Sequence, residues 1–224
     1  MRPEDDLLGR PLALVVALAL VSLLPFVFMS VTSFVKISTV LQIVRGAIGA
    51  QNVPSSTVIM ALAGALTLLA MAPVGDAIYK RAAPLVAAKP PPDTMTLLAS
   101  GLDAFREPMR DFLRANADER ERARFLAVAR NARPEADRVS VSADDLTVLV
   151  PSFVVTELTE AFAIGFLLYL PFLVIDLVIA NILLALGMQM LSPTQVSLPF
   201  KLLLFVSIHG WGLLGQALVS GYHH

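Results

Sequence analysis

Long apolar stretches without charged side chains alternate with shorter polar segments along this chain of 224 residues. Residues 11–35, 46–75, 177–200 and 202–224 contain no Asp, Glu, Lys or Arg. About 20 apolar residues in a helix cross roughly 30 Å of hydrocarbon, so each stretch is long enough to span a bilayer. The pattern predicts an all-α membrane protein in which about four apolar helices form two long hairpins on either side of a small polar domain.

The first two stretches predict an N-terminal helical hairpin within residues 1–83. Proline inside a helix removes a backbone hydrogen bond and clashes with the preceding turn. Kinks are therefore predicted at Pro25 in the first helix and at Pro73 near the end of the second. Pro54 belongs to the predicted turn between the two helices.

The polar part of the chain, residues 84–145, is predicted to be a small, water-exposed helical domain. Residues 80–145 hold 12 of the 17 basic and 11 of the 18 acidic residues. The prolines within 84–93 predict a boundary that no helix crosses. Beyond them, apolar residues recur at steps of three and four, and this spacing predicts an amphipathic helix with the stripe Met95, Leu98, Leu102, Phe105, Met109 and Phe112.

A C-terminal helical hairpin is predicted for residues 146–224. Its first helix continues to about Gly187, around 40 residues or about 60 Å at 1.5 Å per residue. Because this is about twice the thickness of a bilayer, either the helix is broken at Pro171 or part of it lies outside lipid.

The second helix of this hairpin has a recognisable start. Ser192 is the predicted cap, Pro193 occupies the first helical position, and Gln195 can complete a capping box. Pro199 lies inside the helix and is a further candidate for a kink.

Composition narrows the function classes. The chain is 56% hydrophobic and 16% charged and has no cysteine, which excludes disulfides, thiolate metal sites and cysteine nucleophiles. A net charge of −1 offers no basic footprint for nucleic acid. The histidines lack metal-ligand spacing, and no phosphate loop or nucleophile motif is present. We therefore predict no catalysis, no metal and no cofactor.

Five charged residues fall inside or beside apolar stretches. A charge at the centre of a membrane helix costs about 2.5–3.5 kcal/mol on insertion scales, so each should be paired, near a helix end or turned toward protein or water. They are Lys36, Glu157, Glu160, Asp176 and Lys201.

Lys201 stands about two turns into its helix and has two interpretations. Its long stem can snorkel to the lipid headgroups. Alternatively it forms a salt bridge, either with Asp176 of the same chain or with an acid on a neighbouring subunit. We favour the salt bridge and place its partner on another chain.

Met188 and Met190 flank Gln189 at the tip of the C-terminal hairpin. Methionine often fills gaps in ordinary cores, but a hairpin tip is not a core. Flexible thioethers on converging chains could form a deformable apolar constriction that excludes water when closed.

Several segments resemble the R component of the type III secretion export apparatus, the SctR/YscR/HrcR family related to flagellar FliP. They are "TSF" at 32–34, "MAPV" at 71–74, "ELTEAFAIGFLLYLPFLVID" at 157–176, "ALGMQMLSPTQVSLPFKLLLF" at 185–205 and "GW" at 210–211.

The resemblance implies a multi-pass protein of the bacterial inner membrane, assembled in five copies with the S and T components and other inner-membrane export proteins. Secreted proteins would pass through unfolded, the middle domain would be periplasmic, and much of the assembly would stand above the bilayer. Residues 188–190 would be a pore gasket, in which Gln189 replaces a methionine common in the family. The N-terminus lacks a typical cleavable signal, which favours the injectisome branch over the flagellar one.

A second function class stays open at this point. A proton-coupled transporter of small solutes could use Asp176, Glu157 and Lys36 as a proton relay near the middle of the membrane.

Overall fold

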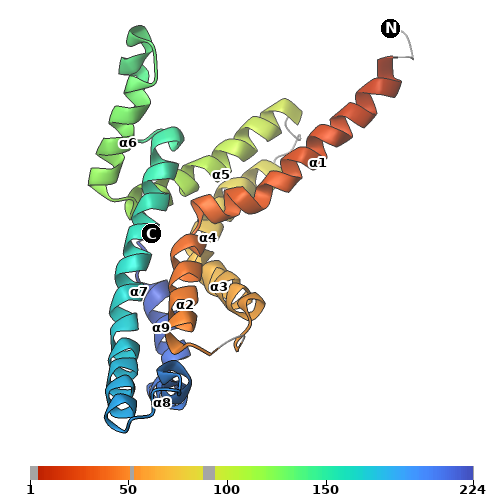
Figure 1. Ribbon diagram of the computed structural model, residues 1–224. Coiled ribbons are helices and arrows are strands. Elements are labelled where there is room, and N and C mark those ends of the chain that lie inside the picture. Colours follow the sequence, from red (N-terminus) through yellow and green to blue (C-terminus); the bar gives the residue numbers. More distant parts are fainter. Residues whose placement is uncertain (1–4, 51–52, 88–93, 224) are drawn as a thin grey trace.

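The computed structural model describes residues 5–50, 53–87 and 94–223, and within these ranges the chain is helical without a strand. The all-α prediction is confirmed. The elements are α1 (Asp5–Val31), α2 (Phe34–Ile48), α3 (Ser56–Ala70), α4 (Ala72–Ala87), α5 (Thr94–Asn116), α6 (Glu119–Asn131), a 3₁₀-helix η1 (Glu135–Ser140), α7 (Leu146–Ala185), α8 (Pro193–Ser207) and α9 (Gly210–Ser220) (Figure 1).

Helix α7 is the central element of the fold, and α2, α5, α6 and α8 pack against it. It runs for 40 residues without interruption through Pro151 and Pro171, so its predicted length is confirmed and the alternative of a break at Pro171 is wrong. Each proline removes a single hydrogen bond, and the neighbouring turns keep theirs. Within the described residues α7 alone is long and apolar enough to cross a membrane, and up to four spans result if each bent helix pair counts as one.

The first helical segment bends at Thr32 and Ser33, where α1 and α2 meet at 73°. The predicted kink at Pro25 is not a break, since α1 passes through this residue. Thr32 explains the location: its hydroxyl donates to the carbonyl of Phe28 and accepts from the amide of Phe34. A side chain that takes over backbone hydrogen bonds favours the end of a helix.

The second segment bends by 52° between α3 and α4 at Met71. Pro73 lies in the first turn of α4, where its missing amide proton is tolerated, so the predicted kink is confirmed. The predicted boundary at residue 84 is wrong for its first residues, because α4 continues through Pro84 to Ala87. The remaining prolines of that run, within 88–93, lie outside the described residues.

A third bend was not predicted. Helices α8 and α9 meet at 58°, and His209 between them has the left-handed φ of 53°. The Phe205 ring occupies the space beside Gly210, where an added Cβ would come within 2.3 Å of Cε2. The close approach of this ring to the backbone requires glycine at 210. Pro199 lies inside α8, which is not interrupted there.

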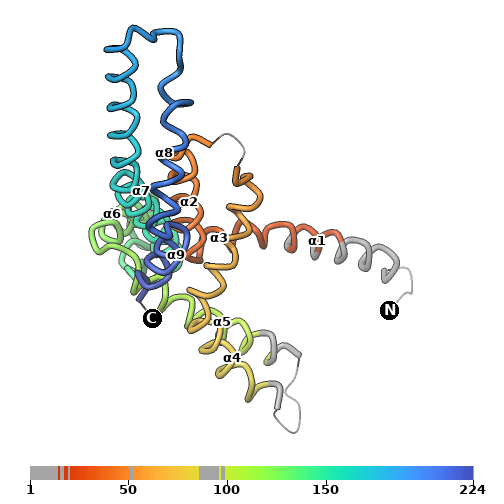
Figure 2. Tube along the Cα trace, turned by 90° about the horizontal axis from the view of Figure 1, so that it is seen from below, coloured from red at the N-terminus to blue at the C-terminus, as the bar shows by residue number. Residues whose placement is uncertain are grey.

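The core forms where α2 lies against α7 and α3. Its centre is a row of fully buried α2 side chains that includes Ile37, Val40 and Leu41. Gly165 of α7 allows the close approach, since a Cβ there would lie 2.5 Å from Cδ1 of Ile43. Viewed from below, α8 and α9 also lie beside α2, while α1 points away from the body (Figure 2).

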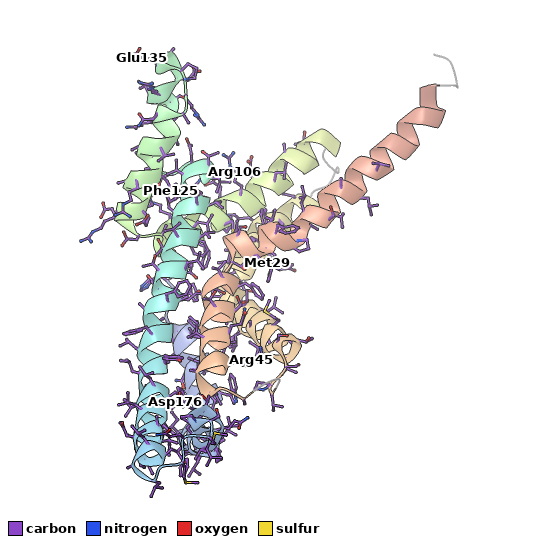
Figure 3. All side chains as sticks on the ribbon, viewed as in Figure 1. Met29, Arg45, Arg106, Phe125, Glu135 and Asp176 are labelled. Atoms are coloured by element: carbon purple, nitrogen blue, oxygen red, sulfur yellow. The ribbon has the colours of Figure 1, made fainter. Side chains whose placement is uncertain are left out.

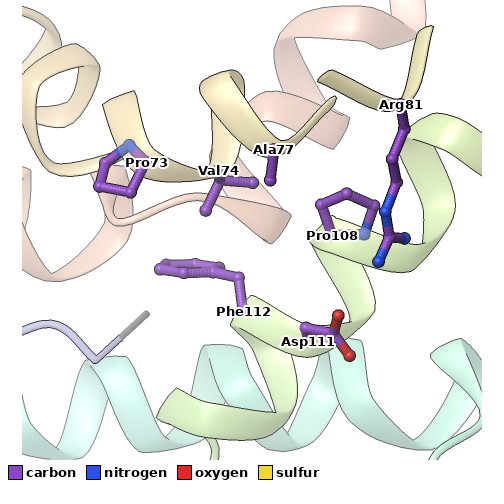
Figure 4. A pocket seen from close by; sticks show the side chains of 7 residues that line it. All are labelled: Pro73, Val74, Ala77, Arg81, Pro108, Asp111 and Phe112. Atoms are coloured by element: carbon purple, nitrogen blue, oxygen red, sulfur yellow. The ribbon is translucent and has the colours of Figure 1, made fainter. Parts of the chain in front are cut away.

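The amphipathic helix predicted after the prolines is α5, and the side chains of Met95 and Leu98 from the predicted stripe lie outside the described ones. Met109 and Phe112 join the central core, whereas Leu102 and Phe105 stay exposed. Between α4 and α5 lies a hollow of about 190 Å³ (Figure 4), lined by Pro73, Val74, Ala77, Arg81, Pro108, Asp111 and Phe112. Part of the polar region therefore shares the core of the apolar hairpins.

Candidate functional site

The turn between α7 and α8 lies at the far end of the long hairpin (Figure 1). Gly187 adopts a left-handed φ of 71°. The amide of Met188 donates to the carbonyl of Leu183, and the amide of Gly187 donates to that of Leu184. These two bonds form a Schellman motif, which satisfies the last carbonyls of α7 and reverses the chain direction. The position of Met188 thus follows from a glycine-capped helix end.

Apolar side chains of this turn have no cover in a single chain. Met190 is 100% exposed, and Leu186, Met188 and Leu191 are also exposed. Gln189 between the methionines is exposed as well. Such a cluster at a helical tip indicates a surface that another molecule covers. The gasket role of residues 188–190 stays a prediction.

The start of α8 confirms one part of the sequence prediction and contradicts another. Pro193 is its first residue and Ser192 its cap. The Ser192 side chain makes no capping hydrogen bond, so that half of the predicted capping box is absent. The carbonyl of Ser192 instead accepts from the amides of Gln195 and Val196.

Lys201 is buried, with 2% of its surface exposed. Its Nζ lies 2.6 Å from Oδ2 of Asp176 on α7 and donates to the Ala47 carbonyl at 3.1 Å. The second acceptor is one of the unpaired carbonyls at the C-terminal end of α2, where a cation is favourable. Ser197 of α8 donates to the other oxygen of Asp176, which lies low on α7 in Figure 3.

This geometry decides between the interpretations of Lys201. The ammonium does not snorkel, and its partner is the acid of its own chain rather than one on a neighbour. Our prediction of a partner on another chain is wrong, because α2 and α8 both pack against α7 and so place the Ala47 carbonyl and Asp176 beside Lys201. The resulting contact holds α2, α7 and α8 together beside the turn at 188–190.

A second buried cluster lies higher on α7. Lys36 of α2 places its Nζ 2.8 Å from Glu157 and 2.7 Å from Glu160. The Glu157 side chain is fully buried and that of Glu160 is 53% exposed. The Tyr222 hydroxyl donates to the second oxygen of Glu157. Burial, and next the Glu157 carboxylate, raise the pKa of Tyr222, so its hydroxyl stays a donor.

The sequence did not point to Tyr222, Ser197 or the Ala47 carbonyl as partners of these charges. For Tyr222, the sequence shows a tyrosine just after a long apolar stretch. Such a residue often buries its ring while its hydroxyl finds a hydrogen-bond partner. Which charge the hydroxyl would reach depends on the fold.

The first hairpin has a turn of its own, in which Pro54 lies as predicted. The Arg45 guanidinium donates from Nε to the Pro54 carbonyl at 2.7 Å. Arg45 is labelled in Figure 3. Gly49, with a φ of 78°, ends α2 as Gly187 follows α7. Both hairpins therefore reverse direction at a left-handed glycine.

Fold and site together define an all-helical membrane protein whose longest hairpin ends in an uncovered apolar turn. The sequence pattern of the FliP family matches residues 17–218, so the protein belongs to the FliP family. The resemblance inferred from short segments is confirmed.

Several relatives match along most of their length. The hypersensitivity response secretion protein HrcR of Ralstonia nicotianae is 45% identical over 94% of this chain and 96% of its own. The Yop proteins translocation protein R of Yersinia pestis is 42% identical over 93% of this chain and 95% of its own. The flagellar biosynthetic protein FliP of Caulobacter vibrioides is 38% identical over 95% of this chain and 77% of its own.

Proposed function

We propose that this chain is a subunit of the export gate of a type III protein secretion system in the bacterial inner membrane. Five copies assemble with the S and T components and other inner-membrane export proteins, and the assembly conducts unfolded proteins. Relatives named as a secretion protein and a translocation protein support this assignment. The subunit has no catalysis of its own, and its partners supply the energy.

The observation that carries the proposal is the uncovered apolar turn at the end of α7. In a ring of copies, the turns converge on one axis, and Met188 and Met190 line the narrowest point. Thioether side chains are flexible and polarisable, so they pack together when the pore is empty and rearrange around a passing chain. An apolar constriction of this kind blocks ions by excluding water.

Gln189 sits between the two methionines and alters this seal. A primary amide in a dry ring costs free energy unless its donors and acceptors are paired. Gln189 is exposed in the single chain, so its partners in the ring come from neighbouring copies or from water. The closed constriction therefore holds more water than one lined by three methionines.

The uncovered apolar surface of the rest of the molecule also supports an assembly in or above a membrane. Residues 21–29 of α1 are exposed on every side of the helix, and much of the lower half of α7 is exposed and apolar. Contiguous surface of this kind requires lipid or other subunits. With α7 at about 60 Å, part of the assembly stands outside the hydrocarbon layer.

The proton-coupled transporter is the weaker alternative. Its relay needs Asp176, Glu157 and Lys36 in one site, but Asp176 pairs with Lys201 while Glu157 pairs with Lys36. The two acids are 19 residues apart on one helix, about 28 Å at 1.5 Å per residue. Two separate ion pairs brace helices, and neither passes a proton to the other.

Cross-linking of single cysteines tests the assignment, because the chain has no cysteine of its own. In native membranes with the partner proteins present, Met190→Cys forms disulfides between copies if the turns converge. Val139→Cys, also highly exposed but near the tip of the polar region, is the matched control. A large complex in mild detergent accompanies this result, whereas a monomer or dimer without cross-links would support a carrier.

A further inference from the structure

The segment that follows α9 docks onto other helices through a single aromatic side chain. Tyr222 is buried, and its ring stacks on Phe112 of α5 with centroids 5.9 Å apart. Its hydroxyl donates to Glu157 of α7 and lies 3.2 Å from the Ser33 carbonyl at the start of α2. Three helices from both hairpins and from the polar region thus meet at Tyr222.

The next residue is held by its backbone. Nδ2 of Asn116 donates to the His223 carbonyl at 2.8 Å, and Oδ1 of Asn116 accepts from the His223 amide at 3.0 Å. Because both bonds use the main chain at 223, they fix the path of the segment whatever side chain stands there. Asn116 is the last residue of α5. Its two hydrogen bonds therefore hold the segment against the joint between α5 and α6.

Tyr222 also serves both charges of the buried ion pair. Its hydroxyl reaches the Glu157 carboxylate, and the Lys36 ammonium lies 4.4 Å from the centre of its ring. A cation over an aromatic face is attracted by the ring quadrupole. A buried ion pair is tolerated only when further hydrogen bonds and contacts compensate its lost hydration. Tyr222 supplies a hydrogen bond to Glu157 and a ring contact to Lys36.

A polar hollow of about 180 Å³ opens beside this contact. Its lining includes Lys36, Asn116, Asp118, Thr156, Glu160 and His223. The joint between α5 and α6 forms one wall, where the amide of Asp118 donates to Oγ1 of Thr156 on α7 at 2.9 Å. Lys36 already borders the hollow, whereas Glu157 is fully buried behind Tyr222, so water would reach Glu157 if Tyr222 and His223 lifted away.

We propose that residues 221–223 form a conformational clasp. When docked, the clasp seals the Lys36–Glu157 pair and holds the joint between α5 and α6 against α7. When released, it hydrates the pair and frees that joint, so that the polar arm of α6 and η1 moves relative to the apolar hairpins. The clasp does not depend on whether the protein conducts polypeptides.

A cysteine reporter measures the docking directly. Ser152 of α7 is fully buried one turn before Thr156, on the helix face that meets the joint. Its hydroxyl donates within α7, to the Val148 carbonyl. With Ser152→Cys in the full chain in native membranes, we expect Tyr222→Phe to speed maleimide labelling by about tenfold, the change expected for a lost hydrogen bond to a charged group. Asn116→Ala acts in the same direction.

Two controls separate release of the clasp from general loosening. Tyr79→Phe removes the hydroxyl of an exposed tyrosine on α4 and leaves the labelling rate unchanged. Thr67→Cys places a second reporter in the buried face of α3, and its rate stays constant in the clasp variants. Unchanged labelling at Ser152→Cys in both clasp variants, or an equal rise at both reporters, would overturn the proposal.

Discussion

The Nζ atom of Lys201 lies 2.6 Å from Oδ2 of Asp176, and both residues belong to the same chain. This pair fastens the middle of α8 to α7, and the Ala47 carbonyl adds the end of α2. The apolar turn between α7 and α8 therefore projects from a braced platform. If the turn forms the proposed constriction, this support keeps the hairpin from moving as a whole when a chain passes.

Removing Lys201 should weaken this support. Lys201→Met leaves Asp176 without its cation, and breaking a buried pair costs about 3–5 kcal/mol. We expect the lower end of this range, because the Asp176 side chain is 26% exposed and water screens its charge. Thermal unfolding of the detergent-purified complex measures the loss. Lys80→Met, which changes an exposed lysine on α4, is the control, and equal stability of both variants would contradict a structural role.

The methionine turn should control ion leakage. Replacing Met188 and Met190 together by alanine shortens two exposed apolar side chains and widens the constriction, so ion conductance of the closed complex rises while export continues. Planar-bilayer recordings measure the leak, and Met29→Ala on exposed α1 is the matched control. A closed-state conductance that does not change would remove the gasket interpretation.

Gln189→Met should have the opposite effect. The substitution replaces an amide that needs hydrogen-bond partners by a thioether that does not, so the ring becomes drier. We expect a lower closed-state conductance than in the unchanged protein, measured in the same recordings. A higher conductance would show that the amide seals the ring through hydrogen bonds.

The two glutamates that face Lys36 should differ in their contribution to stability. Glu157→Gln leaves the Lys36 ammonium without its fully buried counter-ion and costs about 3–5 kcal/mol. Glu160→Gln removes a half-exposed partner and costs at most about 1 kcal/mol. Denaturation of both variants in the same detergent compares them, and a larger loss for Glu160→Gln would refute the assigned order.

Gly187 should tolerate no side chain. A left-handed φ costs residues other than glycine about 1–2 kcal/mol, so Gly187→Ala destabilises the turn and lowers the melting temperature. Gly64→Ala is the matched control inside α3, where an added Cβ meets no atom within 4 Å. Alanine there stabilises the helix by about 0.5–1 kcal/mol. Opposite shifts in melting temperature are the expected result.

The helix bends show which features could be predicted from nearby residues in the sequence. Pro73 could be placed at a bend because a proline acts on its own turn. The bend at Thr32 depends on a threonine hydroxyl that competes for backbone groups, and the one at His209 depends on the Phe205 ring packed against Gly210. Both contacts join residues two to five positions apart, but the sequence does not show which hydrogen bond or packing position such a side chain adopts.

The buried charges were likewise predicted only in part from the sequence. Sequence could identify Lys36, Glu157, Asp176 and Lys201 as groups that need partners, since the cost of a charge in apolar surroundings does not depend on the fold. It offered Asp176 as one of two candidate partners of Lys201 but could not choose between them, and it did not pair Lys36 with Glu157. Tyr222, which completes one pair, is 65 residues from Glu157 in the chain.

By itself the sequence determined that this protein is helical, that it needs an apolar environment and that its longest helical stretch is about 40 residues. These properties follow from hydrophobic period and length, which each segment carries locally. Only the tertiary structure decided which charges neutralise each other and which apolar residues stay uncovered. Those outcomes arise from contacts between segments distant in the chain, and the free energy of each contact depends on burial that exists only after the helices pack.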